Sequence, residues 1–358
     1  MKKNWIKVGV LTLFLAALLL FIMGCEADDE EEISLSFATF WPAEDFQVDD
    51  GHKAWAEEIK EKVEEETPYA IDFTWHYGGE LLDADEIFEG VMEGAADIGT
   101  TCPSYTPGRF PVTSAFELPG LENDNALVSS KAIQEAYETF DPVAEEYEGV
   151  ELMHLWATGP GDVITVGEPV ESLEDLDDMS IRVAGGSVPV AESLGATPVT
   201  EPMSEAYLSL EQGLVEGILS PTDVLKGFML AEVTDYITKT PYLYNIVFMK
   251  IMNQDTWEQL PEEVQEIFVE VNQKYTYEYG VLRTEHTKLG QEFGVEEYGM
   301  EVIELPAEEE EKWLEAIEPV QDEWKDDAVE EGLPGEEIME TVLELDENYS
   351  EQYGDYFE

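Results

Sequence analysis

Residues 175–221 constrain the fold most, because short apolar runs alternate there with segments of helical character. The run at 180–184 ends at a Gly-Gly pair, which is typical of a buried strand. Beyond it the pattern predicts a helix at 188–194, a strand at 197–200, a helix at 204–212 and a strand at 215–219. Strands that alternate with helices in this way favour an α/β fold built on a parallel sheet.

Arg182 lies within the first of these strands and is one of only three arginines in the chain. A rigid strand would present its planar guanidinium at a strand end, where open α/β sheets bind ligands. A guanidinium held in this way is suited to bidentate capture of a carboxylate. Arg182 is therefore the leading candidate for a ligand-binding residue.

The rest of the chain continues the α/β pattern and ends in a helical third. Strands are expected at 33–39, 70–75, 97–101, 150–156, 162–166, 233–238 and 242–252, and helices at 45–66, 83–93 and 125–147. Further helices are expected at 262–293, 307–331 and 336–353, with one short strand at 300–305. The joints 91–99 and 209–218 share a plan of helix, glycine and strand. This similarity between the two segments indicates either two lobes of like topology or chance.

We predict two lobes that the chain crosses more than once, with a central cleft and hinge strands between them, as in proteins that close about a hinge. Lobe I would comprise 33–158 plus 241–262, and lobe II would comprise 159–240 plus 285–358. A long helix at 263–284 would span both lobes, as part of a long C-terminal helix system.

The N-terminus has the pattern of a secretory signal. Three lysines precede an apolar run at 8–23, which ends at Gly24-Cys25. Residues 22–25 resemble a bacterial lipobox, so we expect a lipoprotein signal peptide at 1–24, lipidation of Cys25 and an acidic tether at 25–32. An uncleaved anchor helix is the alternative, and both place the remaining chain outside the cytoplasmic membrane. If Cys25 carries lipid, Cys102 is the one cysteine left, and we expect it to be a small buried residue.

The charge excludes several classes of partner. The chain contains 83 acidic and 17 basic residues, a formal net charge of −66. Nucleic acids and anionic membrane surfaces would repel such a protein. The acidic residues are dispersed over helices whose apolar faces are intact, so salt would screen their mutual repulsion over a Debye length of about 3 Å at 1 M. This pattern favours a halophilic or haloalkaliphilic source.

We expect the melting temperature of the chain from residue 26 onward to rise steadily from low to molar NaCl, because screening reduces the repulsion among the acidic side chains. Thermal unfolding followed by circular dichroism measures this. A neutral osmolyte at equal osmolality is the control, and a melting temperature that does not rise with NaCl contradicts the prediction.

Several motifs together resemble one transport family. They are I-R-V at 181–183, L-G-A-T-P-V at 194–199, E-A-Y-L-S-L-E-Q-G-L-V-E-G at 205–217, G-G-E-L-L at 78–82, E-S-L-E-D-L-D-D-M-S-I-R at 171–182 and M-N-Q-D-T-W-E-Q-L-P at 252–261. In this order and spacing they are similar to solute-binding proteins of tripartite ATP-independent periplasmic (TRAP) transporters, of the dicarboxylate type. The resemblance implies a fold like that of periplasmic binding proteins. It also implies capture of a small organic anion outside the membrane and delivery to a membrane permease.

The resemblance also implies roles for particular residues. Arg182 would hold the substrate carboxylate, and Ser220 stands where the family often has an asparagine that supports it. Dicarboxylate-binding members often carry a second arginine at a place that falls near Gly161 here, so a monocarboxylate with an apolar or hydroxylated remainder is expected. Three aromatic residues at predicted strand ends could form the walls or belong to the core: Trp41, Tyr105 and Trp156. Arg109 could be a second cation or a structural loop residue.

Catalytic motifs of hydrolases, metalloproteases and nucleotide-binding enzymes are absent from the sequence, so we expect no enzymatic activity and no cofactor. Some members of the family use a metal ion to bridge substrate and protein, but this sequence contains no ligand spacing for one. Two alternatives to transport remain open at this point. They are a ligand sensor that feeds a signalling receptor and an extracytoplasmic hydrolase that uses carboxylates.

Overall fold

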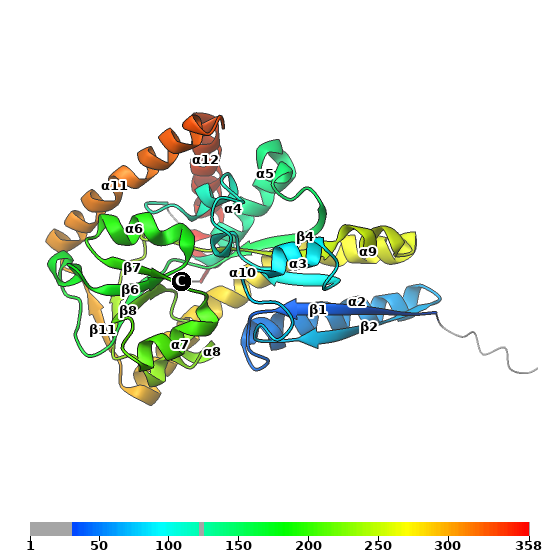
Figure 1. Ribbon diagram of the computed structural model, residues 1–358, viewed down its shortest axis with the longest axis horizontal. Helices are drawn as coiled ribbons and strands as arrows, with labels where there is room; N and C mark the ends of the chain where they lie inside the picture. The colour runs from blue at the N-terminus through cyan, green and yellow to red at the C-terminus, as the bar shows by residue number, and fades with distance from the viewer. Residues whose placement is uncertain (1–30, 122–124, 358) are drawn as a thin grey trace, which may run out of the picture.

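The computed structural model describes residues 31–121 and 125–357 (Figure 1). The predicted signal peptide and the predicted lipidation site, Cys25, lie outside the described residues. The predicted acidic tether ends at residue 32, whereas β1 (Glu31–Thr39) already begins at Glu31. Among the described residues, no helix combines the length and the apolar character needed to cross a membrane.

The described residues form two sheets, and the first has five strands in the order β2-β1-β3-β10-β4. β1 pairs in parallel with β2 and β3, and β10 returns antiparallel between β3 and β4. The bounds are β2 (Tyr69–His76), β3 (Ile98–Thr101), β4 (Val150–Ala157) and β10 (Val247–Asn253), with η1 (Gln47–His52), α2 (Lys53–Glu66) and α3 (Ile87–Met92) in the connections. The predicted strand-helix-strand pattern of the N-terminal part is therefore present.

The second sheet has six strands in the order β11-β9-β5-β8-β6-β7. β6 pairs in parallel with β7 and β8, and β5 is antiparallel to β8 and β9. The bounds are β5 (Asp162–Thr165), β6 (Ser180–Val183), β7 (Thr197–Thr200), β8 (Gly217–Ser220), β9 (Tyr236–Lys239) and β11 (Glu301–Glu304), with α6 (Val188–Ser193), α7 (Met203–Glu211) and α8 (Val224–Gly227) between them. The chain passes between the sheets at 158–161 and at 240–246.

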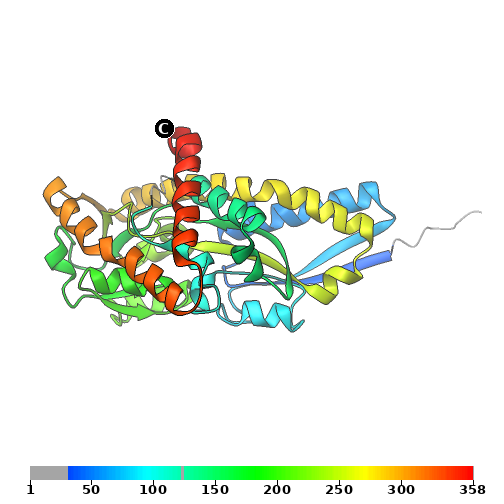
Figure 2. The same cartoon turned by 90° about the horizontal axis from the view of Figure 1, so that it is seen from above.

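A single long helix joins the two halves. α10 (Glu262–Tyr298) has 37 residues, follows the short α9 (Gln254–Gln259), and runs along the length of the molecule (Figure 2). It packs on β4 of the first half and on α8 of the second. Gly290 allows the close approach to the second half, because a Cβ there would lie 2.7 Å from the Cα of Asp223 and closer still to the carbonyl oxygen of Thr222.

The helix predicted at 125–147 is interrupted. α4 (Ala126–Thr139) ends at Phe140, whose backbone is extended, and α5 (Asp141–Glu145) follows. Pro142 lies at the start of α5, where the missing backbone N–H costs nothing, but within a continuous helix it would remove a hydrogen bond. The prediction of one continuous helix was therefore wrong.

The C-terminal helices form a hairpin that contacts both halves. α11 (Ala307–Glu330) packs against α6, beside the second sheet, whereas α12 (Gly335–Tyr353) packs along α4 (Figure 1). The elbow between them is tight, because Leu333 N donates to Ala328 O at 2.8 Å and a Cβ on Gly335 would meet the carbonyl oxygen of Lys325 at 2.6 Å. The division predicted from the sequence assigned all of 285–358 to lobe II. For α12 this is corrected, because the direction of the elbow returns the chain to the first half.

Candidate ligand-binding site

A small cavity lies between the two sheets. Residues that follow β1, β3 and β8 line it, together with residues of β6, the start of β10 and the middle of α10. Its volume is about 40 Å³, measured as the space open to the centres of water molecules. Since one water needs about 10–15 Å³ on this measure, the cavity fits a few waters or one small molecule.

Arg182 provides a buried positive charge in this cavity. Its side chain lies in β6 and is 1% exposed. Nε and Nη2 donate to the carbonyl oxygen of Glu201 at 3.0 and 2.6 Å. A carbonyl fixes the plane of the guanidinium but does not neutralise it, and in the described part of the chain no carboxylate forms a salt bridge with Arg182. The group is therefore held ready for an anion.

Two phenols and a hydroxyl surround this arginine. Tyr105 lies beside the guanidinium, and its hydroxyl accepts a hydrogen bond from Met203 N at 3.0 Å. Burial raises the pKa of Tyr105 to about 12, with Arg182 opposing the shift. Burial also raises the pKa of Tyr244, which lies beside Ser220 and within electrostatic range of Arg182. Both phenols are therefore protonated at neutral pH and can donate hydrogen bonds to an anion.

Tyr244 occupies the space beside Gly161. A Cβ on Gly161 would overlap the Tyr244 ring, and Gly161 N donates to Tyr244 O at 2.9 Å. Because a larger residue at 161 would displace this ring, Gly161 and Tyr244 fit each other. No side chain can be added at 161 without moving the Tyr244 ring, so this part of the cavity carries a phenol.

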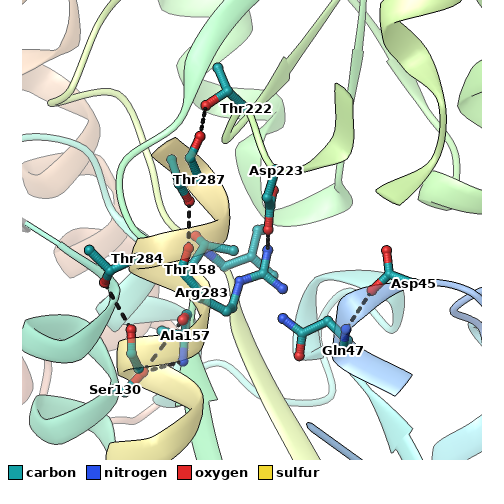
Figure 3. Close-up of polar contacts among 12 residues, drawn as sticks. Asp45, Gln47, Ser130, Ala157, Thr158, Thr222, Asp223, Arg283, Thr284 and Thr287 are labelled. Atoms are coloured by element: carbon teal, nitrogen blue, oxygen red, sulfur yellow. Dashed lines mark hydrogen bonds and ion pairs between the residues drawn. The ribbon is translucent and has the colours of Figure 1, made fainter. Parts of the chain in front are cut away.

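A second polar group lines the cavity and was not found from the sequence. Nη2 of Arg283, in α10, contacts Oδ2 of Asp223 at 2.6 Å, and the two side chains are 4% and 2% exposed (Figure 3). Asp45 accepts a hydrogen bond from Gln47 N at 2.8 Å, and the Gln47 side chain lies between Asp45 and Arg283. One feature of the sequence could have pointed to Arg283 as a site residue: it is one of only three arginines in a strongly acidic chain.

Of the residues predicted to form the walls, some line the cavity and others do not. Trp41 lines the cavity and stacks on Phe40, with 4.0 Å between ring centroids. Trp156 does not line it; this side chain is fully buried behind Trp41, at a centroid distance of 6.2 Å. Arg109 also lies outside the lining, and its Nε is 3.7 Å from Oε1 of Glu89. Of the predicted residues, the structure brings Arg182, Ser220, Trp41 and Tyr105 together at the cavity. Cys102, buried as expected, also lines it.

The model of the family DctP, described as bacterial extracellular solute-binding protein, family 7, matches residues 37–327. The chain belongs to this family. The resemblance found in the sequence is thereby confirmed. Members of family 7 are solute-binding proteins of transport systems and not enzymes, and they act outside the cytoplasm.

Individual relatives agree with this membership. The ectoine-binding periplasmic protein TeaA of Halomonas elongata is 29% identical over 269 residues, which cover 73% of this chain and 74% of TeaA. A TRAP periplasmic solute-binding protein of Desulfovibrio salexigens has a TM-score of 0.75 at 30% identity, covering 91% of this chain and 99% of that one. A TRAP solute-binding protein of Rhodoferax ferrireducens has a TM-score of 0.83 at 23% identity, covering 89% and 99%. The predicted α/β class and two-lobe fold are therefore confirmed.

This family 7 protein should be less stable at higher pH because of Asp45. Burial raises the pKa of Asp45 to about 7; the nearby Asp223 carboxylate adds to the shift, whereas the bond from Gln47 N and the Arg283 charge oppose it. An unfolded aspartate has a pKa of about 3.9, so between about pH 4 and 7 the folded chain holds a proton that the unfolded chain has lost. The free energy of unfolding should therefore fall across this interval and level off above it.

Urea unfolding in high salt at several pH values measures this effect, with Asp45→Asn as the comparison. The substitution removes the titration but keeps the size of the side chain. Because the other acidic residues also repel one another more as the pH rises, the informative quantity is the difference in slope between the two proteins. Equal slopes would contradict the assignment.

Proposed function

We propose that this family 7 protein captures a small monocarboxylate outside the cytoplasmic membrane, closes its two lobes on Arg182 and delivers the anion to a TRAP permease. The observation that carries the proposal is the buried guanidinium, fixed by the Glu201 carbonyl and left without a carboxylate partner in the described chain. A buried charge without a counter-ion is costly, so a bound carboxylate compensates it.

The neighbours of Arg182 support an anion at this place. Tyr105 and Tyr244 are protonated donors at its side, and Ser220 adds a hydroxyl. An ion pair on the surface contributes less than about 1 kcal/mol, whereas charge-assisted bonds are stronger when water is excluded. The anion therefore gains most of its affinity when the lobes close and expel water from the cavity.

The chemistry of the walls favours a single carboxylate on a ring or an apolar chain. Trp41, Phe40 and Phe248 give the cavity aromatic sides, and Tyr244 fills the place near Gly161. One solved relative binds aromatic acids (marine metagenome, 25% identical, TM-score 0.82) and another binds mandelate (Bordetella bronchiseptica, 25% identical). TeaA binds ectoine, and the DctP protein of Rhodobacter capsulatus binds C4-dicarboxylates. We assign this chain to the monocarboxylate group.

Contacts between the halves support closure around the ligand. Tyr105, from the first half, meets Met203 N of the second at 3.0 Å. Gly227 has no room for a side chain because the Asp45 carboxyl group occupies that space. A ligand that contacts both halves stabilises the closed form relative to the open one. In this proposal Cys25 carries the lipid that keeps the protein at the outer face of the membrane, close to its permease.

Thermal unfolding of the soluble chain from residue 26, in high salt, against a panel of carboxylic acids tests the proposal. We expect a rise of several degrees with a monocarboxylate such as benzoate or mandelate, because a ligand that binds only the folded state stabilises it. Succinate serves as the dicarboxylate comparison and should give a smaller shift. The absence of any shift at all salt levels would contradict the proposed function.

A further inference from the structure

The cavity has a second polar end, formed by Asp45, Asp223 and Arg283, that a simple carboxylate would leave unused. All three residues line the cavity. Arg182, in β6, donates to the carbonyl oxygen of Glu201, whereas Arg283, in α10, pairs with Asp223. The cavity therefore has two polar groups, held by different elements and different partners.

Both side-chain amide atoms of Gln47, which lies beside this end but does not line the cavity, are buried without a hydrogen-bond partner among the described residues. Two atoms of the residues that do line it are unpaired as well. They are Oδ1 of Asp223 and Nε of Arg283. Their side chains belong to one ion pair, Nη2 to Oδ2 at 2.6 Å, so the two orphaned atoms flank the same contact. Buried polar atoms in native proteins almost always have a partner, and a missing one costs free energy. One orphan is an acceptor and the other is a donor.

We propose that this end of the cavity binds a hydroxyl group of the ligand, which donates to Oδ1 of Asp223 and accepts from Nε of Arg283. The inference rests on the proposed function, since Arg182 must hold the carboxylate of the same molecule. The ligand class is then a hydroxylated monocarboxylate whose hydroxyl is remote from the carboxylate.

Other groups fit this place less well. An ammonium group could donate to Asp223, but it would leave Arg283 Nε without an acceptor and would face a guanidinium. A second carboxylate could accept from Arg283, but it would oppose the oxygens of Asp45 and Asp223. A hydroxyl is donor and acceptor at once and adds no charge. A bound water has the same capacity, so the ligand hydroxyl would replace it without losing a hydrogen bond.

The aromatic residues beside Arg283 define what connects the two ends. The guanidinium carbon lies 4.9 Å from the centre of the Phe248 ring and 5.8 Å from that of Phe46. Both rings line the cavity. The part of the ligand between carboxylate and hydroxyl therefore passes an apolar, aromatic stretch, which suits a phenyl ring or a short hydrocarbon chain.

Calorimetric titration with matched pairs of acids tests this inference. The probes are benzoate and phenylacetate with their 3- and 4-hydroxy derivatives, and butanoate with 4-hydroxybutanoate. In the wild-type protein we expect at least one hydroxy acid to bind at least about tenfold more tightly than its parent acid, because the parent leaves both buried atoms either unpaired or dependent on an immobilised water. In Arg283→Lys, which keeps a cation beside Asp223 but lacks Nε, this ratio should fall to about one.

Arg109→Lys is the control, since Arg109 lies outside the cavity lining and should leave the ratio unchanged. If Arg283→Lys does not fold, the wild-type ratio still decides whether a hydroxyl is recognised. Parent acids that bind as well as every hydroxy derivative would overturn the inference and leave the proposed function standing. An undiminished ratio in a folded Arg283→Lys protein would overturn the assignment to this ion pair. If no acid binds at all, the proposed function fails and the inference falls with it.

Discussion

Replacing Arg182 with alanine should weaken carboxylate binding by roughly 30-fold to several thousandfold, since removing one partner of a buried charge pair costs about 2–5 kcal/mol. The chain should stay folded. Without ligand the guanidinium is buried and forms no salt bridge with a carboxylate of the described chain, so its removal takes away a desolvated charge rather than an ion pair. Titration calorimetry with the best acid of the panel measures the loss, and circular dichroism checks the fold.

Two further variants separate charge from geometry at this position. Arg182→Lys keeps the positive charge but not the planar fork, and we expect it to recover only part of the affinity. Arg109→Ala removes an arginine whose side chain is 37% exposed and lies outside the cavity lining, so binding should be unchanged. Affinity retained in Arg182→Ala would refute the carboxylate clamp.

The second large effect concerns the long helix. We expect Gly290→Ala to lower the free energy of unfolding by about 3 kcal/mol, since an added methyl group that meets fixed atoms forces the surrounding backbone to shift. At this position the Cβ would lie 2.7 Å from the Cα of Asp223 and closer to the Thr222 carbonyl, so relief requires moving the segment after β8. Urea unfolding at fixed high salt measures the change.

Gly294, one turn further along α10, is the matched control. A Cβ there would meet the Sδ of Met300 at 2.7 Å and a methyl carbon of Leu225 at 3.0 Å, both in flexible side chains. Alanine also favours a helix over glycine by about 1 kcal/mol, which offsets the rearrangement. Gly294→Ala should therefore change stability by less than about 1 kcal/mol. If the two variants are equally stable, the close approach at Gly290 is not what joins the helix to the second half.

The α/β framework was predictable because local patterns decide where strands and helices form. Short apolar runs bounded by glycine, such as the one at 180–184, became strands of the two sheets. The predictions failed where something other than the local apolar pattern decides the structure, namely a proline within a helix or the direction of a turn. Pro142 divided a helix whose apolar spacing is continuous, and the position of α12 depends on the direction of the elbow at 331–334, for which side-chain periodicity contains no information.

The site was only partly predictable, for a similar reason. Arg182, Tyr105 and Ser220 lie at strand ends or just beyond them, and the topology of an α/β sheet brings such ends together. Arg283 lies within a helix, and its partner Asp223 is 60 positions away in the sequence. Only the packing of α10 on the second half joins them. Trp156 shows the opposite error, since a place at a strand end does not reveal whether another aromatic side chain will cover it.

The C-terminal hairpin also affects how strongly the protein can hold its ligand. α11 packs on α6 of the second half and also donates from Gln321 to the carbonyl oxygen of Pro119 in the first, whereas α12 packs on the first half. Parting the halves must therefore break these contacts of α11, bend the tight elbow or detach one helix. The apparent dissociation constant of a ligand that needs the closed form depends on how much of the protein is closed beforehand. The two C-terminal helices can thus influence the ligand affinity of a cavity that they do not line. Changes in the length of the elbow would tune capture against release while leaving ligand selectivity intact.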